Sequence, residues 1–334
     1  MSEIIILAIE SSCDDTSAAV IKDGNVLSNI ISTQTAHAEY GGVVPELASR
    51  EHQVHIVPVI DAAIQKAGIS KSDLSAIAFT RGPGLLGSLI VGVTFAKSMA
   101  LSLDVPLIEV HHMHAHVLAH FAELPHPTFP FLCLTVSGGH TQIIKVDDYG
   151  TMKILGQTID DAAGEAFDKT GKMLGLPYPA GPLIDRHAQQ GQVTYQFPES
   201  KVGDLDFSFS GLKTSILYFL RDNVKEDPDF IKNNLDNICA SVQHTIIQTL
   251  IKKLIKAAEK TGITKIAIAG GVSANSGLRK AIEEISIEKN WTSFVPAFQY
   301  CRDNAGMIGI AAYYKYLNKD FCGLDVTAEA RLEF

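Results

Sequence analysis

Apolar and polar positions in the first part of the chain follow the pattern of three consecutive β-strands. An apolar run at residues 4–10 (IIILAIE) is followed by a small polar turn (SSCDDTS), and the runs AAVI and VLSNII are then separated by a turn at residues 22–25. Short apolar runs bounded by Gly, Asn, Asp and Ser are typical of strands joined by tight turns. Residues 4–31 therefore predict a buried first strand and two further strands.

The same plan returns at residues 129–155, where the runs FPFLCLTV, QIIKV and TMKIL are separated by the turns SGGHT and DDYG. Two copies of one strand-led unit indicate a duplicated α/β protein, and ligands commonly bind in the cleft of such proteins. The chain of 334 residues is long enough for two domains. We expect their boundary near residues 121–130.

Helical periodicity and glycine-rich turns follow each strand unit. Residues 45–66 have apolar spacing close to that of a helix, which ends at Gly68. Small-residue turns after apolar strands lie at residues 11–17, 81–88, 137–141 and 270–277. Backbone N–H groups in such turns can hold an anion, and glycine lets a helix N-terminus approach a phosphate closely. Four such turns in one chain favour a nucleotide ligand.

A cluster of histidines is the strongest chemical signal. Five of the twelve histidines lie between His111 and His120. His112 and His116 are four residues apart, as are His116 and His120, so each pair shares one face of a helix and could bind a metal ion. The alternative is that these histidines cap a helix or pack in an interface. Asp303, before a helix of small residues, can complete a His/His/Asp set that suits iron or zinc.

An acidic segment at residues 158–175 (TIDDAAGEAFDKTGKMLG) precedes an apolar-periodic helix. Asp160 and Asp161 suit the start of that helix, where negative charge meets the helix dipole. Asp168 lies deeper inside it and is a candidate acceptor for ribose hydroxyls or a substrate amine. Gly181 permits close approach of a ligand, and Asp185 is within reach of the same ligand.

Composition narrows the class of protein. The start of the chain lacks a basic flank and a cleavage site, and no segment approaches the roughly 20 apolar residues of a spanning helix, so we expect a cytoplasmic protein without membrane contact. Five scattered cysteines argue against a disulfide framework. The net charge of −9 argues against a globally basic nucleic-acid binder. The lysines between residues 252 and 260 are typical of a solvated helix face.

Three functions remain open on these residues. A metalloprotease of the His-Glu-x-x-His type needs a glutamate after the first histidine, but Met113 follows His112. A small-molecule kinase of the duplicated actin-like type would use the phosphate turns but not a histidine-bound metal. A nucleotide-linked group transferase would use both features.

Taken together, the motifs resemble the tRNA N6-adenosine threonylcarbamoyltransferase family, earlier described as O-sialoglycoprotein endopeptidases. The resemblance runs essentially end to end and in a specific order. It rests on IESSCDDTSAAV, HAEYGGVVPELASREH, GPGLLGSLIVG, VHHMHAH, TVSGGHTQ, IDDAAGEAFDKTGKMLGLPYPAGP, DFSFSGLKT, AGGVSANSGLR and RDNAGMI. Bacterial members commonly have His-Met-Glu-Gly-His where this chain has His114 and Ala115, so His114 could offer an alternative ligand.

The resemblance implies a duplicated actin-like, Hsp70-like (ASKHA) fold with a nucleotide and metal cleft between its lobes. We expect an N-terminal lobe at residues 1–125 and a C-terminal lobe at residues 126–334, with an inserted helical segment around residues 156–240. His112, His116 and Asp303 would hold one divalent ion per subunit, with Fe²⁺ expected and Zn²⁺ as the alternative. The substrate pocket would be lined by Thr135, Val136, Ser137, Gly138, Gly139, Asp168, Gly181, Asp185 and Asn275.

The reaction implied is transfer of threonylcarbamoyl from threonylcarbamoyl-AMP to N6 of the adenosine next to the anticodon (position 37) of tRNAs that read codons starting with A, with release of AMP. His140, beside the Ser-Gly-Gly turn, is the candidate for contact with the reacting groups. A chain of net charge −9 should bind tRNA poorly alone. Partners are therefore expected, by resemblance a non-catalytic paralogue (TsaB-like) and a P-loop ATPase (TsaE-like).

Overall fold

The computed structural model describes residues 3–200 and 202–334, which divide into two compact units. Unit 1 comprises the chain up to His126, Asp148–Met152 and Pro296–Phe334, and unit 2 comprises Pro127–Asp147 and Lys153–Val295. The chain first passes from unit 1 to unit 2 between His126 and Pro127, next to the boundary expected from the sequence. The assignment of residues 296–334 to the C-terminal lobe is wrong, because this segment packs within unit 1.

Five strands form the sheet of unit 1, in the order β3-β2-β1-β4-β5. β1, β2 and β3 form an antiparallel meander, and β4 and β5 run parallel to β1. The first three strands are those predicted from residues 4–31. The strands are β1 (Ile5–Glu10), β2 (Asp15–Lys22), β3 (Asn25–Thr33), β4 (Ala76–Gly82) and β5 (Leu107–His111).

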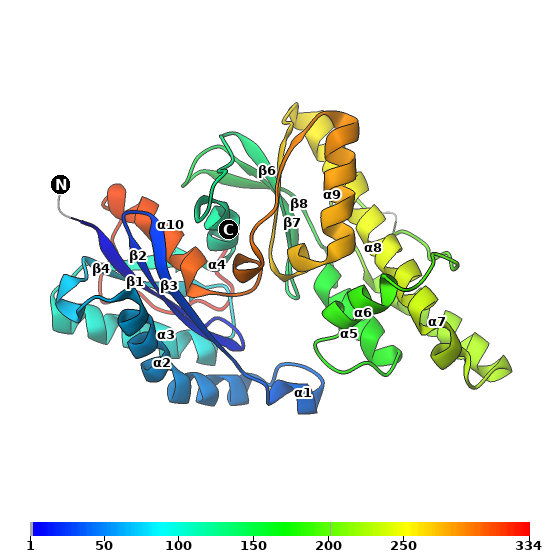
Figure 1. Cartoon of the computed structure of the whole chain (residues 1–334), viewed down its shortest axis with the longest axis horizontal. Coiled ribbons are helices and arrows are strands. Elements are labelled where there is room, and N and C mark those ends of the chain that lie inside the picture. Colours follow the sequence, from blue (N-terminus) through cyan, green and yellow to red (C-terminus); the bar gives the residue numbers. More distant parts are fainter. Residues whose placement is uncertain (1–2, 201) are drawn as a thin grey trace. The chain divides into compact units, whose positions relative to one another are not determined.

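The helices of unit 1 are distributed over both faces of this sheet (Figure 1). The α-helices are α1 (His37–Tyr40), α2 (Pro45–Ala67), α3 (Leu86–Leu103), α4 (His112–Leu118) and α10 (Ala305–Leu317). Short 3-10 turns add η1 (Lys71–Asp73), η2 (Ala119–Phe121) and η4 (Phe298–Tyr300).

Side chains of the buried strand β1 alternate between two layers of helices. Leu7 and Ile9 pack in one cluster with apolar residues of α2 and α3. On the opposite face, a Cβ atom at Gly309 of α10 would lie 3.2 Å from the side chain of Ala8. The glycine therefore lets α10 lie close to the strand, which explains why residues 296–334 belong to unit 1. Glu10 alternates onto the same face as Ala8.

The helix α3 has the length and apolar composition of a membrane-crossing helix, contrary to the expectation that no segment approaches this limit. Leu89, Val93 and Ala96 are buried, and α3 packs against α2 and β4. Some of its apolar side chains are therefore those of a core helix, whereas Ile90 and Leu101 are exposed.

The sheet of unit 2 repeats the topology of the first. Its order is β10-β9-β6-β7-β8, so each strand takes the place of the strand five earlier in the chain. β6 and β7 are antiparallel, and β9 and β10 are parallel to β6. This equivalence confirms the predicted duplication. The strands are β6 (Phe131–Val136), β7 (Thr141–Val146), β8 (Met152–Gln157), β9 (Lys265–Ala269) and β10 (Thr292–Phe294).

Among the residues that the structure describes between β8 and β9, four α-helices extend the helical segment expected around residues 156–240 to residue 261. They are α5 (Ala163–Met173), α6 (Gly181–Ala188), α7 (Ser210–Glu226) and α8 (Phe230–Thr261). After β9 come the 3-10 turn η3 (Gly271–Ala274) and α9 (Ser276–Lys289).

The lysines of α8 form exposed ion pairs at the surface of unit 2. Lys252 pairs with Glu199, and Lys256 and Lys260 both pair with Asp204. Acidic side chains therefore offset this positive charge, as expected for a solvated helix face.

Candidate metal centre and ligand cradle

The junction between β5 and α4 positions the two central histidines. His111 ends β5 and caps α4, because its side chain accepts a hydrogen bond of 3.1 Å from the backbone N–H of Met113. One helical turn then separates His112 from His116, whose ring centroids lie 4.7 Å apart. Both side chains are buried, with 9% and 1% of their surface exposed. The predicted i,i+4 pair therefore lies on one face of a short helix.

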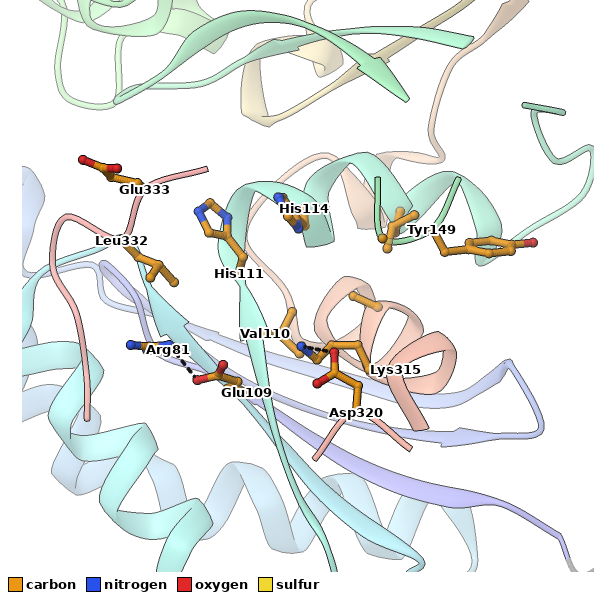
Figure 2. Close-up of a pocket in the computed structure, with 13 residues that line it drawn as sticks. Arg81, Glu109, Val110, His111, His114, Tyr149, Lys315, Asp320, Leu332 and Glu333 are labelled. Carbon is orange, nitrogen blue, oxygen red and sulfur yellow. Dashed lines mark hydrogen bonds and ion pairs between the residues drawn. The ribbon is translucent and has the colours of Figure 1, made fainter. Parts of the chain in front are cut away.

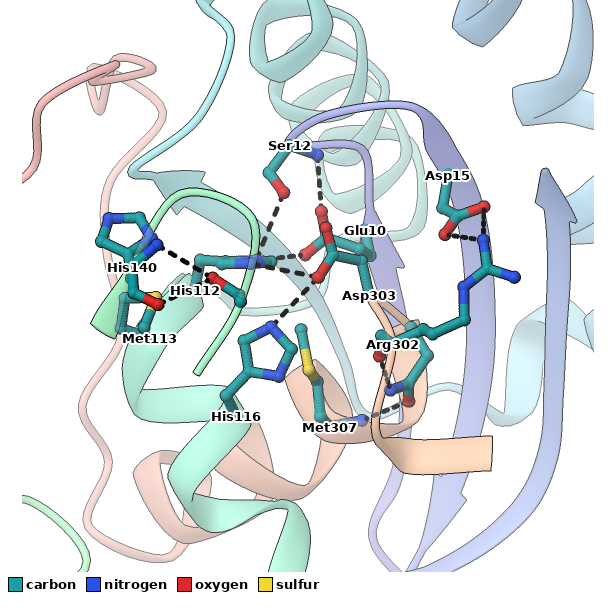
Figure 3. A network of polar contacts seen from close by, with 12 residues as sticks. Glu10, Ser12, Asp15, His112, Met113, His116, His140, Arg302, Asp303 and Met307 are labelled. Carbon is teal, nitrogen blue, oxygen red and sulfur yellow. Dashed lines mark hydrogen bonds and ion pairs between the residues drawn. The ribbon is translucent and has the colours of Figure 1, made fainter. Parts of the chain in front are cut away.

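Asp303 reaches the same point from the loop before α10 (Figure 3). Its Oδ1 atom lies 3.0 Å from Nε2 of His116 and 3.4 Å from Nε2 of His112. The next residue, Asn304, fixes the loop by accepting a hydrogen bond from the N–H of Met307. One candidate ligand atom from each of the three residues lies within 4.8 Å of the others. The structure thus brings together the three residues named from the sequence as metal ligands.

Glu10 supports the cluster and was missed by sequence reasoning. It is fully buried at the end of β1, and its Oε2 atom accepts hydrogen bonds from Nδ1 of His112 at 3.1 Å and from Thr80 at 2.6 Å. Its Oε1 atom accepts from the N–H of Ser12 at 2.5 Å. A carboxylate bound to one imidazole nitrogen orients the other nitrogen toward a metal. The available signal was an acidic residue closing an otherwise apolar strand.

The electrostatics of the cluster favour a cation at its centre. Burial alone would lower the pKa of His112, but the carboxylates of Asp303 and Glu10 outweigh it and raise this pKa to about 10. Burial alone would raise the pKa of Asp303, but His112 and His116 hold it well below its usual value. The site holds two carboxylates and two imidazoles. A proton on His112 balances part of the negative charge of the carboxylates, and a divalent ion could balance that charge instead.

The donor set fits the expected metals. Two imidazole nitrogens and one carboxylate oxygen form a set that leaves coordination positions open on Fe²⁺ or Zn²⁺. Among the described residues, Nδ1 of His116 is buried without a hydrogen-bond partner, so it can carry the proton and leave the Nε2 lone pair available. The Asp303 side chain is 27% exposed, which leaves the cluster open on that side.

The other histidines of the motif do not join this cluster. His114 stacks on His111 at a centroid distance of 4.6 Å and contacts the ring of Phe334 at 4.4 Å. Burial and the nearby Lys315 lower its pKa to about 4. Neither His114 nor His120 belongs to the group of potential ligands found among the described residues. The expectation that His114 offers an alternative ligand is therefore wrong.

In unit 2, the turn after β6 leaves space around the backbone of two of its glycines. Thr135 and Val136 are buried within the strand, whereas Cβ atoms at Gly138 and Gly139 would meet nothing within 4 Å. The turn closes on itself: the N–H of Ser137 donates to the carbonyl of His140 at 2.8 Å. The predicted small-residue turn thus presents free backbone at residues 138 and 139.

Two glycines allow neighbouring elements to pack against this turn. At Gly164, in the first turn of α5, a Cβ atom would lie 2.6 Å from the carbonyl oxygen of Ser137. At Gly270, where φ is +85°, a Cβ atom would lie 2.4 Å from the carbonyl oxygen of Val136. Neither distance is compatible with a side chain. The end of β6 is therefore held between the start of α5 and the turn after β9.

The remaining predicted pocket residues form two hydrogen-bonded groups in unit 2. Oδ1 of Asp168 accepts from the N–H groups of Ala180 and Gly181 at the start of α6. The second group contains the two predicted residues Asp185 and Asn275, together with Gln243 and Ser276, which sequence reasoning missed.

The second group ties three helices together. Asp185 accepts hydrogen bonds from Gln243 on α8 and from the N–H and hydroxyl groups of Ser276 on α9. Asn275 caps α9 by accepting from the N–H of Leu278, and it donates to Gln243 at 2.7 Å. Gln243 lies in α8, whose sequence pattern indicates only a helix packed against the core. The sequence around Gln243 therefore does not predict its hydrogen bonds.

The acidic pair before α5 does not cap that helix, contrary to prediction. Asp160 accepts from the N–H groups of Phe209 and Ser210 at the start of α7, and Asp161 pairs with Lys169 and with a lysine of α7. The dipole argument holds, but for a helix some 50 residues further along the chain. The prediction was wrong because it assigned the two aspartates to the helix nearest in sequence.

These features define a class of protein: a duplicated actin-like (ASKHA) α/β fold with a His/His/Asp cluster in its first unit. The fold is shared with HypF of T. kodakarensis, with a TM-score of 0.62 at 15% identity over 97% of this chain and 49% of that one. It is also shared with component A of the (R)-2-hydroxyglutaryl-CoA dehydratase of Acidaminococcus fermentans, with a TM-score of 0.54 at 14% identity over 95% and 100%.

Sequence comparison identifies the family. The family model for TsaD, tRNA N6-adenosine threonylcarbamoyltransferase, matches residues 25–310. Proteins of that name from Christiangramia forsetii and Cytophaga hutchinsonii are 61% and 56% identical to this chain, over 99% and 98% of its length and 99% and 96% of theirs. The chain belongs to the tRNA N6-adenosine threonylcarbamoyltransferase family. It is a transferase that modifies tRNA, which removes the kinase and protease alternatives.

Proposed function

We propose that this chain transfers threonylcarbamoyl from threonylcarbamoyl-AMP to N6 of the adenosine next to the anticodon, position 37, of tRNAs that read codons starting with A. The N6 nitrogen attacks the carbamoyl carbon and forms a C–N bond, the bond to the phosphate oxygen breaks, AMP leaves with the electron pair, and N6 loses a proton. Family membership supports the group transferred and its tRNA acceptor. The convergence of His112, His116 and Asp303 beside Glu10 is the observation that carries the chemistry.

The proposed cofactor is one divalent ion per subunit, Fe²⁺ with Zn²⁺ as the alternative. His112 and His116 would bind it through Nε2 and Asp303 through Oδ1, the atoms that face one another. When bound, the ion supplies Lewis acidity to the threonylcarbamoyl oxygens and stabilises charge at the reacting carbon. Glu10 keeps the proton on Nδ1 of His112 and so presents Nε2 in the correct orientation.

The adenylate half of the donor is assigned to unit 2. The open backbone at Gly138 and Gly139 suits the phosphate, because a small-residue turn binds anions through its own dipoles. Asp168 and Asp185 are the proposed acceptors for ribose hydroxyls. Thr135 and Val136, which are buried, would act by shaping the turn. Gly181 and Asn275 complete the proposed pocket.

His140 follows the turn and is proposed to contact the reacting groups. Its backbone is fixed, because its N–H donates to the Ser137 hydroxyl oxygen at 3.1 Å. Replacement by alanine, His140→Ala, should lower the rate of transfer and leave metal content unchanged. Unchanged transfer would remove His140 from the proposed site.

Protein partners are proposed because the chain carries a net charge of −9, which disfavours binding of tRNA by the chain alone. We propose a non-catalytic paralogue (TsaB-like) and a P-loop ATPase (TsaE-like), acting in the cytoplasm where tRNA is modified. Exposed apolar side chains on α2 and α3 suit the paralogue: Val54, Val57, Ile90 and Leu101 are between 48% and 68% exposed, beside a hollow of about 660 Å³. A paralogue of the same fold would present an equivalent helix pair.

The acceptor is tested directly with matched tRNAs. The purified chain, with both proposed partners, threonylcarbamoyl-AMP carrying a labelled threonyl group and Fe²⁺, is incubated with an unmodified ANN-decoding tRNA and with the same tRNA carrying guanosine at position 37. Labelled product with the adenosine tRNA alone, together with AMP in equal amount, is the expected result. Equal labelling of both tRNAs, or AMP release without labelled tRNA, would contradict the proposal.

A further inference from the structure

Two histidines outside the metal cluster, His111 and His114, form an aromatic group with Phe334, the last described residue. Phe334 meets His111 and His114 edge-on, at centroid distances of 5.5 and 4.4 Å, and the two imidazoles stack at 4.6 Å. His111 caps α4 and His114 lies in its first turn, so these two residues flank the candidate ligand His112. A contact with Phe334 is therefore a contact with the start of the ligand helix.

The segment that carries Phe334, residues 329–334, is tied to the end of β4. The Glu329 carboxylate pairs with Arg81 at 2.9 Å, and the N–H of Glu329 donates to the Arg81 carbonyl at 2.9 Å. At Gly82 a Cβ atom would lie 1.9 Å from the carbonyl oxygen of Glu329, so only glycine permits this approach. The N–H of Gly84 donates to the carbonyl of Ala330. The segment is thus fixed at its start by backbone and side-chain contacts.

A second route leads from this attachment to His112. The N–H of Leu85 donates to the carbonyl of Ser12 at 2.8 Å, and a Cβ atom at Gly84 would lie 2.5 Å from that same oxygen. The Ser12 hydroxyl lies 3.2 Å from Nδ1 of His112. Residues 329–334 are therefore connected to His112 in two ways. One chain of contacts runs through residues 82–85 and Ser12. The other runs through the rings of His111 and His114.

Figure 2 shows the space beside this segment. A cavity of about 270 Å³ lies among residues of β4, β5, α4, α10 and residues 332 and 333. Among the described residues, Nε2 of His114 is buried without a hydrogen-bond partner. The ring contacts with His111 and Phe334 therefore hold a His114 side chain whose Nε2 atom has no hydrogen bond to hold it.

We propose that residues 329–334 act as a positioning strap for the metal centre, with Phe334 as its key residue. The strap fixes the first turn of α4, and with it the direction of Nε2 of His112. This inference rests on the proposed metal site. It predicts that Phe334, which is not a ligand, changes metal affinity and ligand geometry, in the way that residues supporting a ligand commonly do.

The test uses Co²⁺ as the probe, titrated into the metal-free full chain and followed by its visible absorption. Phe334→Ala should weaken Co²⁺ binding about tenfold and shift the absorption bands, and Phe334→Tyr, which keeps the ring, should restore both. Phe321→Ala is the matched control, because Phe321 packs edge-on against Tyr316, and within the part of the chain that the structure describes no ring contact joins it to His111 or His114. Phe334→Leu, which keeps apolar volume, provides the same test should the alanine variant not fold.

Three outcomes would overturn the strap, and they can be told apart. Co²⁺ binding with equal affinity and equal spectrum in Phe334→Ala and the unchanged chain, while His112→Ala abolishes it, would overturn the strap alone. Co²⁺ binding that does not depend on His112 would overturn the metal site and the strap together. An equal loss of affinity in Phe321→Ala would also overturn it, because the effect would then be one of general stability.

Discussion

Nδ1 of His112 lies 3.1 Å from Oε2 of Glu10, although the two residues are 102 positions apart in the sequence. The contact joins the end of the central strand β1 to the first residue of α4. Because Glu10 is fully buried and accepts three hydrogen bonds through its two oxygens, it has little freedom to move. The direction of the His112 ring is thereby set by the core of unit 1.

Glu10→Gln should weaken metal binding by about 10- to 100-fold, because the amide lacks the negative charge that increases the basicity of His112 and has one acceptor oxygen for three donors. Isothermal titration with Zn²⁺ measures the change. Glu51→Gln is the control: it alters a carboxylate that pairs with a histidine, His55, on the outer helix α2. Equal affinity in Glu10→Gln and the unchanged chain would show that the contact does not support the metal.

Metal binding should release a proton from His112. Its pKa of about 10 lies above the ordinary value of 6.5, so its ion pairs stabilise the metal-free fold fully below about pH 6.5 and lose that contribution as the pH rises toward 10. At about pH 7.5 the imidazole must lose this proton to bind an ion, so affinity should increase with pH. Titration calorimetry in buffers of different ionisation enthalpy should detect at least about one proton released per Zn²⁺. No release would contradict the electrostatic account.

Gly164→Ala should disturb the turn after β6 and spare the metal centre. The added methyl group would lie 2.6 Å from the carbonyl oxygen of Ser137, so the turn must shift. We expect KM for threonylcarbamoyl-AMP to rise about tenfold or more, as a displaced binding backbone implies, with metal content unchanged. Gly150→Ala, where a Cβ atom would meet only the side chain of Asp148 at 3.7 Å, is the control. An unchanged KM in Gly164→Ala would remove the turn from the proposed pocket.

Ile90→Asp should reduce association with the proposed paralogue, because it places a charge in the apolar surface of α2 and α3. Size-exclusion chromatography of the mixed proteins measures the complex. Leu324→Asp is a matched control, since Leu324 and Ile90 are both 48% exposed. A complex that forms equally well with Ile90→Asp would exclude this surface as the partner site.

The duplicated architecture could be predicted from the sequence because hairpin strands are local. The strand units at residues 4–31 and 129–155 show their apolar runs and turns directly. The first forms the antiparallel meander β1-β2-β3, and in the second β6 and β7 pair antiparallel. The return of residues 296–334 to unit 1 could not be predicted, because it depends on the close approach of Gly309 to Ala8, which no local pattern records.

In the candidate site, too, local sequence patterns predicted some residues, and contacts between distant residues determined the others. His112 and His116 could be paired from their helical spacing, and Asp303 was a candidate third ligand from its place before a helix of small residues, which the family resemblance then supported. Glu10 carried a signal, an acidic residue at the end of an apolar strand, but its partner His112 lies far along the chain; Gln243 carried no such signal. Asp160 was assigned to the wrong helix for a related reason: its acidic position marked a cap, but the capped N–H groups belong to Phe209 and Ser210.

The most direct test compares threonylcarbamoyl transfer and bound metal in the unchanged chain, in His112→Ala/His116→Ala and in the control His55→Ala/His244→Ala. Each protein is assayed with both partners, threonylcarbamoyl-AMP and unmodified tRNA, and its metal content is measured by mass spectrometry. The account predicts that the His112/His116 variant loses both bound metal and transfer, while the control keeps both. Transfer that survives the loss of metal would contradict the central claim that this cluster holds the catalytic ion.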